Sequence, residues 1–157
     1  MKHIIIRGPL GVGKSTIARK LSTTLNYEYI SLDQVIDDNK LVPPGVEGVP
    51  LESFLEANKL LLQYAEHSEK PLLIDGCFYH QEQLDDLVAK LGRAVTIFTL
   101  ICSVEECIER DSKRKKVYGE DAARFVYMMT SNVKAGLEID TTNLSADETI
   151  AIIMREL

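Results

Sequence analysis

Short apolar runs alternate with longer amphipathic stretches along this chain. The apolar runs predict five strands, at about residues 3–7, 27–32, 71–75, 94–101 and 136–140. Apolar residues three or four positions apart predict helices at about 14–25, 51–68, 80–91 and 120–135. Two further helices are predicted to begin at capping boxes that Ser103 and Ser145 open. This alternation predicts an α/β fold with a five-stranded parallel sheet that carries helices on both faces.

Composition and charge narrow the class of protein. The 157 residues suit one compact domain, residues 1–157, and leave little room for a second. A formal net charge of −6 disfavours a broad basic surface, so nucleic acid is an unlikely partner. The chain shows no apolar run of membrane-spanning length and no signal-peptide layout, and its three cysteines lack paired spacing. We therefore expect a cytoplasmic protein that does not bind membranes; its oligomeric state is left open.

The most informative motif follows the first predicted strand. Residues 8–15, GPLGVGKS, match the phosphate-binding pattern G-x-x-x-x-G-K-[ST] between a strand and a helix. Its three glycines allow backbone N–H groups to face phosphate oxygens, and the following helix adds its positive dipole end. We expect Lys14 to reach the β- and γ-phosphates of ATP and Ser15 to bind Mg²⁺. The predicted nucleotide-binding residues of this motif are Gly8, Leu10, Gly11, Val12, Gly13, Lys14, Ser15 and Thr16.

Other candidate residues follow the ends of the predicted strands, where ligands bind in parallel sheets. Asp33 and Asp75 are candidates for a general base and for Mg²⁺ ligation through water, and the pattern does not decide which aspartate has which role. Arg110 and Arg114 lie four positions apart on a predicted helix, so they would share one face and clamp a transferring phosphate. Arg110 is also expected to contact the nucleotide, and residues 110–119 to form a short lid.

These motifs resemble those of the small P-loop kinases of the adenylate kinase and shikimate kinase group, and the resemblance extends from end to end. Residues 31–37, SLDQVID, resemble the DSDQxIE stretch of shikimate kinases, in which the second aspartate holds the substrate hydroxyl; Asp33 falls on that position. Residues 73–76, LIDG, resemble the strand that precedes FPR in adenylate kinases, and residues 110–114, RDSKR, resemble the paired lid arginines. The resemblance implies a three-layer P-loop NTPase fold, with Lys14, Asp33, Arg110 and Arg114 as catalytic residues, Ser15 and Asp75 at the metal, and adenine near 141–144.

The sequence departs from this group in the region that binds the phosphoryl acceptor, residues 33–70. No arginine occurs between Arg19 and Arg93, and bidentate arginines are what a phosphate or carboxylate usually requires. The acidic residues Asp33, Asp37 and Asp38 would also repel an anion. We therefore expect a small acceptor that is not strongly anionic: a neutral polyol, a sugar, a nucleoside or an aminated hydroxyl compound. Chloramphenicol phosphotransferase has a similar single aspartate after its second strand.

The leading hypothesis is an ATP-dependent phosphotransferase that moves the γ-phosphoryl group to a hydroxyl of such an acceptor. A nucleoside monophosphate kinase, with cations from Arg110, Arg114 and Arg124, is an alternative within the same fold. A nucleotide-binding switch protein with slow hydrolysis is an alternative from another class, although the chain lacks the guanine-reading NKxD segment. The basic residues 113–116 leave a polynucleotide end-kinase as a further alternative, which the negative net charge disfavours.

Overall fold

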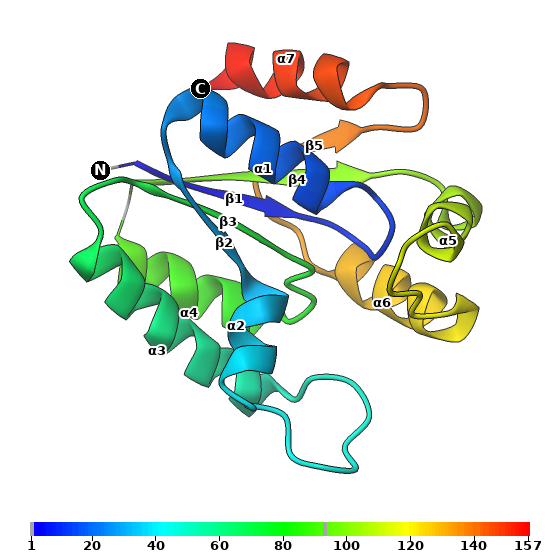
Figure 1. The fold of residues 1–157 in the computed structure, drawn as a ribbon, viewed down its shortest axis with the longest axis horizontal. Coiled ribbons are helices and arrows are strands. Elements are labelled where there is room, and N and C mark those ends of the chain that lie inside the picture. Colours follow the sequence, from blue (N-terminus) through cyan, green and yellow to red (C-terminus); the bar gives the residue numbers. More distant parts are fainter. Residues whose placement is uncertain (1, 93) are drawn as a thin grey trace.

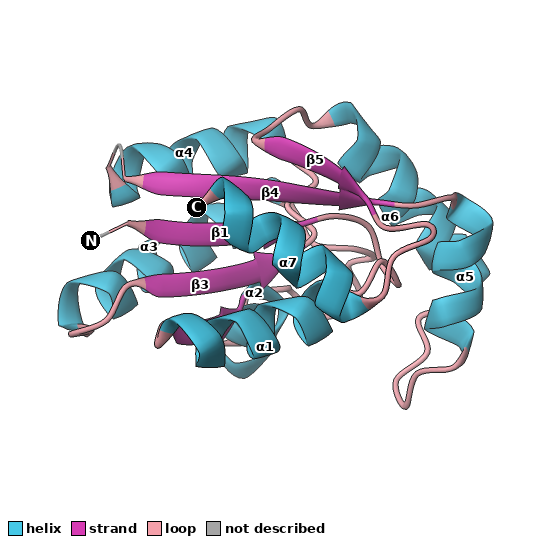
Figure 2. Ribbon diagram, turned by 90° about the horizontal axis from the view of Figure 1, so that it is seen from above, coloured by secondary structure: helices cyan, strands magenta, loops and turns pink. Residues whose placement is uncertain are grey.

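The computed structural model describes residues 2–92 and 94–157 and has one five-stranded sheet at its centre. All strand pairs are parallel, and the strand order is β2-β3-β1-β4-β5. The strands are β1 (His3–Arg7), β2 (Glu28–Ser31), β3 (Leu72–Gly76), β4 (Val95–Ile101) and β5 (Leu137–Asp140). The predicted parallel sheet is therefore confirmed, and it places β1 in the middle (Figure 2).

Helices cover both faces of this sheet (Figure 1). They are α1 (Lys14–Leu25), α2 (Leu32–Asp38), α3 (Leu51–His67), α4 (Gln81–Leu91), α5 (Val104–Ser112), α6 (Glu120–Asn132) and α7 (Ala146–Glu156). In Figure 1, α1 and α7 lie above the sheet, and α3 and α4 lie below it. The predicted three-layer architecture is confirmed. Among the described residues, no helix combines the length and the apolar character needed to cross a membrane.

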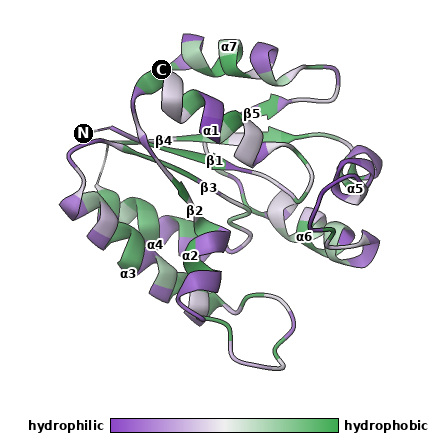
Figure 3. Cartoon of the chain, in the orientation of Figure 1, coloured by the Kyte–Doolittle hydropathy of each residue, from purple (hydrophilic) through white to green (hydrophobic). Residues whose placement is uncertain are grey.

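The central strand contributes to the hydrophobic cores on both faces. Ile4, Ile5 and Ile6 are fully buried, and because side chains alternate along a strand, they divide between the two faces. Ile5 packs in the core between the sheet and helices α3 and α4, whereas Ile4 and Ile6 pack in the core between the sheet and helices α1 and α7. Figure 3 shows apolar and polar segments alternating along these helices, which is typical of helices with one buried face. This burial on both sides fixes the position of the loop that leaves β1.

Two predicted elements end earlier than expected. The strand predicted over 27–32 spans Glu28–Ser31, and α2 begins at Leu32, where no helix was assigned. The Ser31 hydroxyl caps α2 by accepting a bond from the Gln34 N–H (3.4 Å), and Leu32, Val35 and Ile36 form its buried stripe.

The helix predicted over 120–135 also stops early, at Asn132. Val133 adopts an extended conformation and is buried, and its carbonyl accepts a hydrogen bond from Arg7. The tertiary contact with Arg7 thus replaces the bonds of a further helical turn.

Arg7, the last residue of β1, is a fully buried cation that no motif marked. Its guanidinium donates to the carbonyls of Thr130 (2.8 Å), Val133 (3.1 Å) and Phe78 (3.3 Å), and to the Thr99 hydroxyl (3.1 Å). Burial lowers the pKa of Arg7 to about 10, which still leaves it charged at neutral pH. Arg7 therefore ties the end of α6 and the segment after β3 to the central strand.

Replacing this guanidinium should destabilise the fold. In Arg7→Met the three carbonyls lose their donor, and we expect the free energy of unfolding to fall by about 2–4 kcal/mol. Arg155→Met, on the exposed last turn of α7, is the control and should change stability by less than about 0.5 kcal/mol. Urea-induced unfolding followed by circular dichroism measures both. Equal midpoints for the two variants would contradict the structural role assigned to Arg7.

Candidate active site

The phosphate-binding loop joins β1 to α1, as the motif predicted. Gly13 has a left-handed backbone (φ 101°) at the start of α1, a conformation that favours glycine. Gly11 is required for a different reason, because a Cβ atom there would lie 2.1 Å from the carbonyl oxygen of Cys107. The Lys14 ammonium folds back over the loop and donates to the Pro9 carbonyl (2.8 Å). The loop is thus a glycine-dependent cradle that carries its own cation.

A cavity of about 240 Å³ opens over this cradle. Its lining combines the loop, the first turn of α1 and two arginines: Gly11, Gly13, Lys14, Ser15, Thr16, Arg110 and Arg114. We call it the nucleotide cavity. Three other residues predicted to bind nucleotide lie outside this lining: Gly8 packs against the Leu100 carbonyl, Leu10 faces a second cavity, and Val12 is buried.

The two arginines reach the nucleotide cavity from different structural elements. Arg110 lies on α5, pairs with Glu106 and donates to the Val12 carbonyl (3.2 Å). The expectation that Arg114 shares a helix face with Arg110 is wrong, because α5 ends at Ser112. Arg114 lies beyond that end, with a guanidinium nitrogen 3.7 Å from an Asp111 carboxylate oxygen. Both arginines nevertheless line the same cavity.

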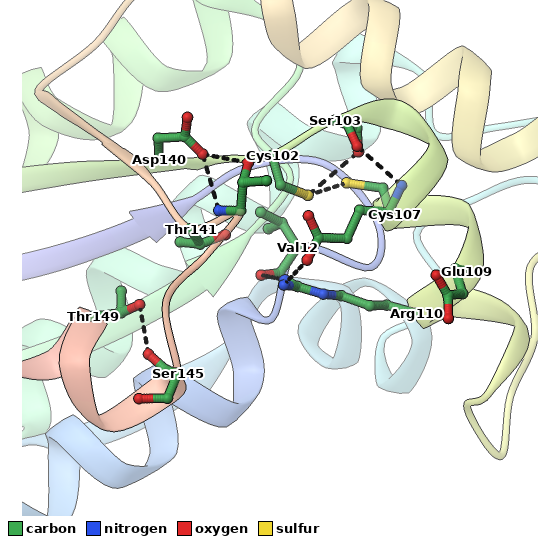
Figure 4. A network of polar contacts seen from close by, with 12 residues as sticks. Val12, Cys102, Ser103, Cys107, Glu109, Arg110, Asp140, Thr141, Ser145 and Thr149 are labelled. Atoms are coloured by element: carbon green, nitrogen blue, oxygen red, sulfur yellow. Dashed lines mark hydrogen bonds and ion pairs between the residues drawn. The ribbon is translucent and has the colours of Figure 1, made fainter.

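Contacts at the start of α5 hold that helix against the phosphate loop (Figure 4). Ser103 caps α5 by accepting a bond from the Glu106 N–H (3.2 Å). The thiols of Cys102 and Cys107 are buried and in contact, with 2.9 Å between their sulfur atoms. Their burial is typical of cysteines that serve in packing. The Cys107 carbonyl of this turn lies against Gly11, so the turn fixes how far Arg110 stands from the phosphate loop.

Asp75, in β3, lies beside the cradle because β3 pairs with β1. Its carboxylate is only 2% exposed and accepts hydrogen bonds from the Ser15 hydroxyl (2.5 Å) and the Tyr29 hydroxyl (3.1 Å). Burial and the Asp75 charge raise the pKa of Tyr29, so this hydroxyl remains a donor. Hydroxyl and carboxylate oxygens are the ligands that Mg²⁺ prefers, so Ser15 and Asp75 together fit a magnesium ion. Sequence reasoning missed Tyr29, which no motif includes.

Asp33 occupies the first turn of α2. It lines the second cavity, of about 840 Å³, which Leu10 of the phosphate loop also borders. Asp33 meets solvent within this cavity, but the surrounding protein displaces bulk water and raises the pKa of its carboxyl. The Lys14 charge opposes this rise and the Asp75 charge adds to it. The positive charge of Lys14 in the phosphate loop therefore acts on Asp33 in the second cavity.

The segment that follows α5 folds back onto Asp111. The Asp111 carboxylate is 1% exposed, and one of its oxygens accepts bonds from the backbone N–H groups of Tyr118 and Gly119 (both 3.1 Å). The Arg114 guanidinium lies near the Tyr118 ring, 5.8 Å from its centroid. Asp111 thus closes the loop that carries Arg114. Sequence reasoning missed this role because a single aspartate within a basic stretch resembles a surface residue.

The segment 141–144, expected near an adenine ring, follows β5 (Figure 4). The Thr141 N–H donates to the Ile101 carbonyl (2.8 Å), which fixes the segment to the end of β4. The N–H and hydroxyl of Thr142 both donate to Asp140. Backbone geometry here is therefore defined by the sheet, and contact with adenine remains a prediction.

Comparisons with known proteins agree with this arrangement. A family model described as "AAA domain" matches residues 4–126. A shikimate kinase from Actinobacillus succinogenes is 27% identical over 161 residues, covering 98% of this chain and 90% of that protein.

Solved structures show the same fold along the chain. A sugar kinase from Janibacter sp. HTCC2649 superposes with a TM-score of 0.80 at 18% identity, covering 99% of this chain and 93% of that one. A shikimate kinase from Acinetobacter baumannii, in complex with shikimate, gives a TM-score of 0.68 at 20% identity and covers 99% and 92%. The chain belongs to the AAA domain family and is a small P-loop kinase of the shikimate kinase and adenylate kinase-like group.

Proposed function

We propose that this kinase transfers the γ-phosphoryl group of ATP to a hydroxyl group of a small acceptor that is not strongly anionic. The observation that carries the proposal is the position of Asp33, which lines a large cavity that reaches the phosphate loop at Leu10, while Gly11 and Gly13 of the same loop line the nucleotide cavity. Transfer of a phosphoryl group needs a donor and an acceptor on opposite sides of the reacting phosphate. ATP would occupy the nucleotide cavity and the acceptor would occupy the second cavity.

The charges of the site suit transfer of a phosphoryl group from the nucleotide cavity toward the second cavity. Lys14, Arg110 and Arg114 surround the nucleotide cavity, where they would neutralise charge that develops on the oxygens of the transferring group. Asp33 lines the second cavity, which we call the acceptor cavity. There it would accept the hydroxyl proton or orient the hydroxyl oxygen for attack. Asp111 holds the loop of Arg114 in place, so the segment 110–119 would act as a lid that excludes water.

We assign the metal site to Ser15 and Asp75, whose side chains are hydrogen-bonded to each other and offer oxygen atoms as ligands. When bound, Mg²⁺ would neutralise negative charge on the β- and γ-phosphates. Asp75 would act through water, because Ser15 lines the nucleotide cavity and Asp75 does not, and Tyr29 orients the Asp75 carboxylate. This leaves Asp33 as the base.

Three alternatives receive less support. A nucleoside monophosphate acceptor would need cations in the acceptor cavity, yet Arg124 pairs with Glu120 and is absent from that lining. A polynucleotide acceptor would need free lysines, whereas Lys113 pairs with Glu109 and Lys116 with Asp37. A switch protein would not need a second cavity of about 840 Å³ beside its phosphate loop.

Asp33→Asn tests the assignment of the base. We expect the variant to lose about 10²–10⁴ in kcat with a hydroxyl acceptor, the usual contribution of a general base, while its Kd for ATP stays unchanged. Asp38→Asn is the matched control, because Asp38 ends the same helix and lies outside the cavity lining. Release of ADP with the best acceptor from a panel of hydroxyl compounds measures both variants. Full activity of Asp33→Asn would remove Asp33 from the mechanism.

The raised pKa of Asp33 predicts a pH dependence. A base works only when deprotonated, so kcat/KM should decline as the pH falls through a pKa that lies above the ordinary value of an aspartate. A profile of kcat/KM against pH reports this pKa for the free enzyme. The acidic limb should vanish from the residual activity of Asp33→Asn; a limb that persists there would belong to another group.

Asp75→Asn tests the metal assignment separately. Loss of the carboxylate should raise the Mg²⁺ concentration needed for half-maximal activity by about 10- to 100-fold, as is typical for outer-shell ligands. Titration of activity with Mg²⁺ at fixed ATP measures the change, with Asp38→Asn as the control. An unchanged Mg²⁺ requirement would exclude Asp75 from the metal site.

A further inference from the structure

The acceptor cavity is built mainly from parts of the chain that no motif covers. α2, the loop over residues 39–50, the first turn of α3, the residues after β3 and the first half of α6 all contribute to it. In Figure 1 the loop after α2 extends below α6. Its volume of about 840 Å³ exceeds that of the nucleotide cavity, about 240 Å³. The acceptor cavity therefore has room for a molecule considerably larger than a simple sugar.

One wall of the acceptor cavity consists of three aromatic rings. The Phe54 and Tyr79 rings meet edge to face, with centroids 5.0 Å apart, and the Phe125 ring lies 6.5 Å from Tyr79. The Tyr79 hydroxyl is occupied, because it accepts from the Val49 N–H (3.0 Å) and donates to the Val49 carbonyl (3.3 Å). These bonds fix the loop to the wall. Tyr79 consequently presents its ring, and not its hydroxyl, to a ligand.

Phe125 is the member of this wall that the fold itself does not need. Its side chain is 49% exposed although it belongs to the cavity lining, whereas Phe54 is 2% and Tyr79 8% exposed. The remaining lining combines charged residues with six aliphatic ones, which are Leu10, Ile36, Val42, Val49, Ala122 and Val126. The lining carboxylates could accept hydrogen bonds from a polyol, but a polyol would leave the aromatic wall uncovered. An apolar ring would instead cover Phe125.

The charged groups of the acceptor cavity oppose an anion. Asp33, Asp37, Glu47 and Asp121 belong to its lining, and Lys116 is the sole cation among the described lining residues. Lys116 is already engaged, with its ammonium 3.7 Å from an Asp37 oxygen and 5.2 Å from the Tyr118 ring centroid. A phosphate or carboxylate would therefore meet several carboxylates and no free guanidinium.

We infer that the phosphoryl acceptor is an alcohol that carries a flat apolar ring, and that it has no phosphate or carboxylate group. This inference rests on the proposed function and narrows its acceptor class, from polyols and sugars toward ring-bearing alcohols. The ring lies against Phe54, Tyr79 and Phe125, and the hydroxyl faces Asp33 and the phosphate loop. The carboxylates of the lining exclude anionic analogues.

Three matched probes test the inference by equilibrium binding: glycerol, the phenyl ether of glycerol, and the same ether with a carboxylate on its ring. All three share a 1,2-diol; the aryl group of the two ethers replaces the hydrogen of the third hydroxyl of glycerol. Ligand-observed NMR titrations of the intact protein give the Kd of each without requiring turnover. We expect the phenyl ether to bind about 10- to 100-fold more tightly than glycerol, from burial of its ring. We expect it to bind about 5- to 10-fold more tightly than its carboxylated form, from charge repulsion.

Phe125→Ala locates the ring. The variant should weaken binding of the phenyl ether by about tenfold and leave glycerol unaffected, because only the ring contacts the wall. Met128→Ala is the matched control: Met128 lies on the same helix, is 55% exposed, and is outside the cavity lining. It should retain wild-type binding of all three probes. Both residues are exposed, so neither substitution removes a core contact.

Either of two outcomes overturns the inference. The first is that glycerol or the carboxylated ether binds as tightly as the phenyl ether or more tightly. The second is that Phe125→Ala binds the phenyl ether as tightly as the wild type. Release of ADP in the presence of the hydroxyl panel separates this failure from failure of the proposed function. Acceptor-dependent ADP release with the wrong order of probe affinities would leave the kinase assignment intact and remove only the ring-bearing class. Absence of acceptor-dependent ADP release across the panel would contradict phosphotransfer itself.

Discussion

The parallel pairing of the buried strand β1 with β3 and β4 is the constraint on which the rest of the site depends. Parallel strands end at the same edge of a sheet, so this pairing brings the phosphate loop, Asp75 and the start of α5 together. β1 is buried on both faces, and Arg7 ties its last residue to α6. The cradle is therefore held by the core of the protein, while the segments that contact ligands are loops and helix ends.

The site is electrically polarised along the direction of the proposed transfer. Cations gather on the nucleotide side, where Arg110 and Arg114 reach the cavity from α5 and from the loop after it. Carboxylates gather on the acceptor side, where desolvation by the surrounding protein raises the pKa of Asp33. The charge of Lys14, which lines the nucleotide cavity, lowers this pKa and opposes the rise. This distribution favours a polyanionic donor on one side and excludes a second anion on the other.

Local structure at the site often serves two purposes. Ser31 caps α2 and so fixes the turn that carries Asp33. Asp111 closes the loop of Arg114 through backbone bonds to Tyr118 and Gly119. Tyr79 packs edge to face against Phe54 and also binds the backbone of Val49, so a single side chain shapes the acceptor wall and anchors the loop over residues 39–50.

The sequence by itself determined the parallel α/β architecture and the phosphate loop, and it indicated Asp33, Asp75 and Arg110 as candidate site residues, because each depends on local pattern or on a motif of fixed spacing. It did not determine the helix over Leu32–Asp38, the end of α5 before Arg114, or the partners of Arg7. The aromatic wall was also invisible, since Phe54, Tyr79 and Phe125 come from three distant segments. Only the tertiary structure brings them together, because contacts between remote segments follow from the packing of helices on the sheet and leave no periodic trace along the chain.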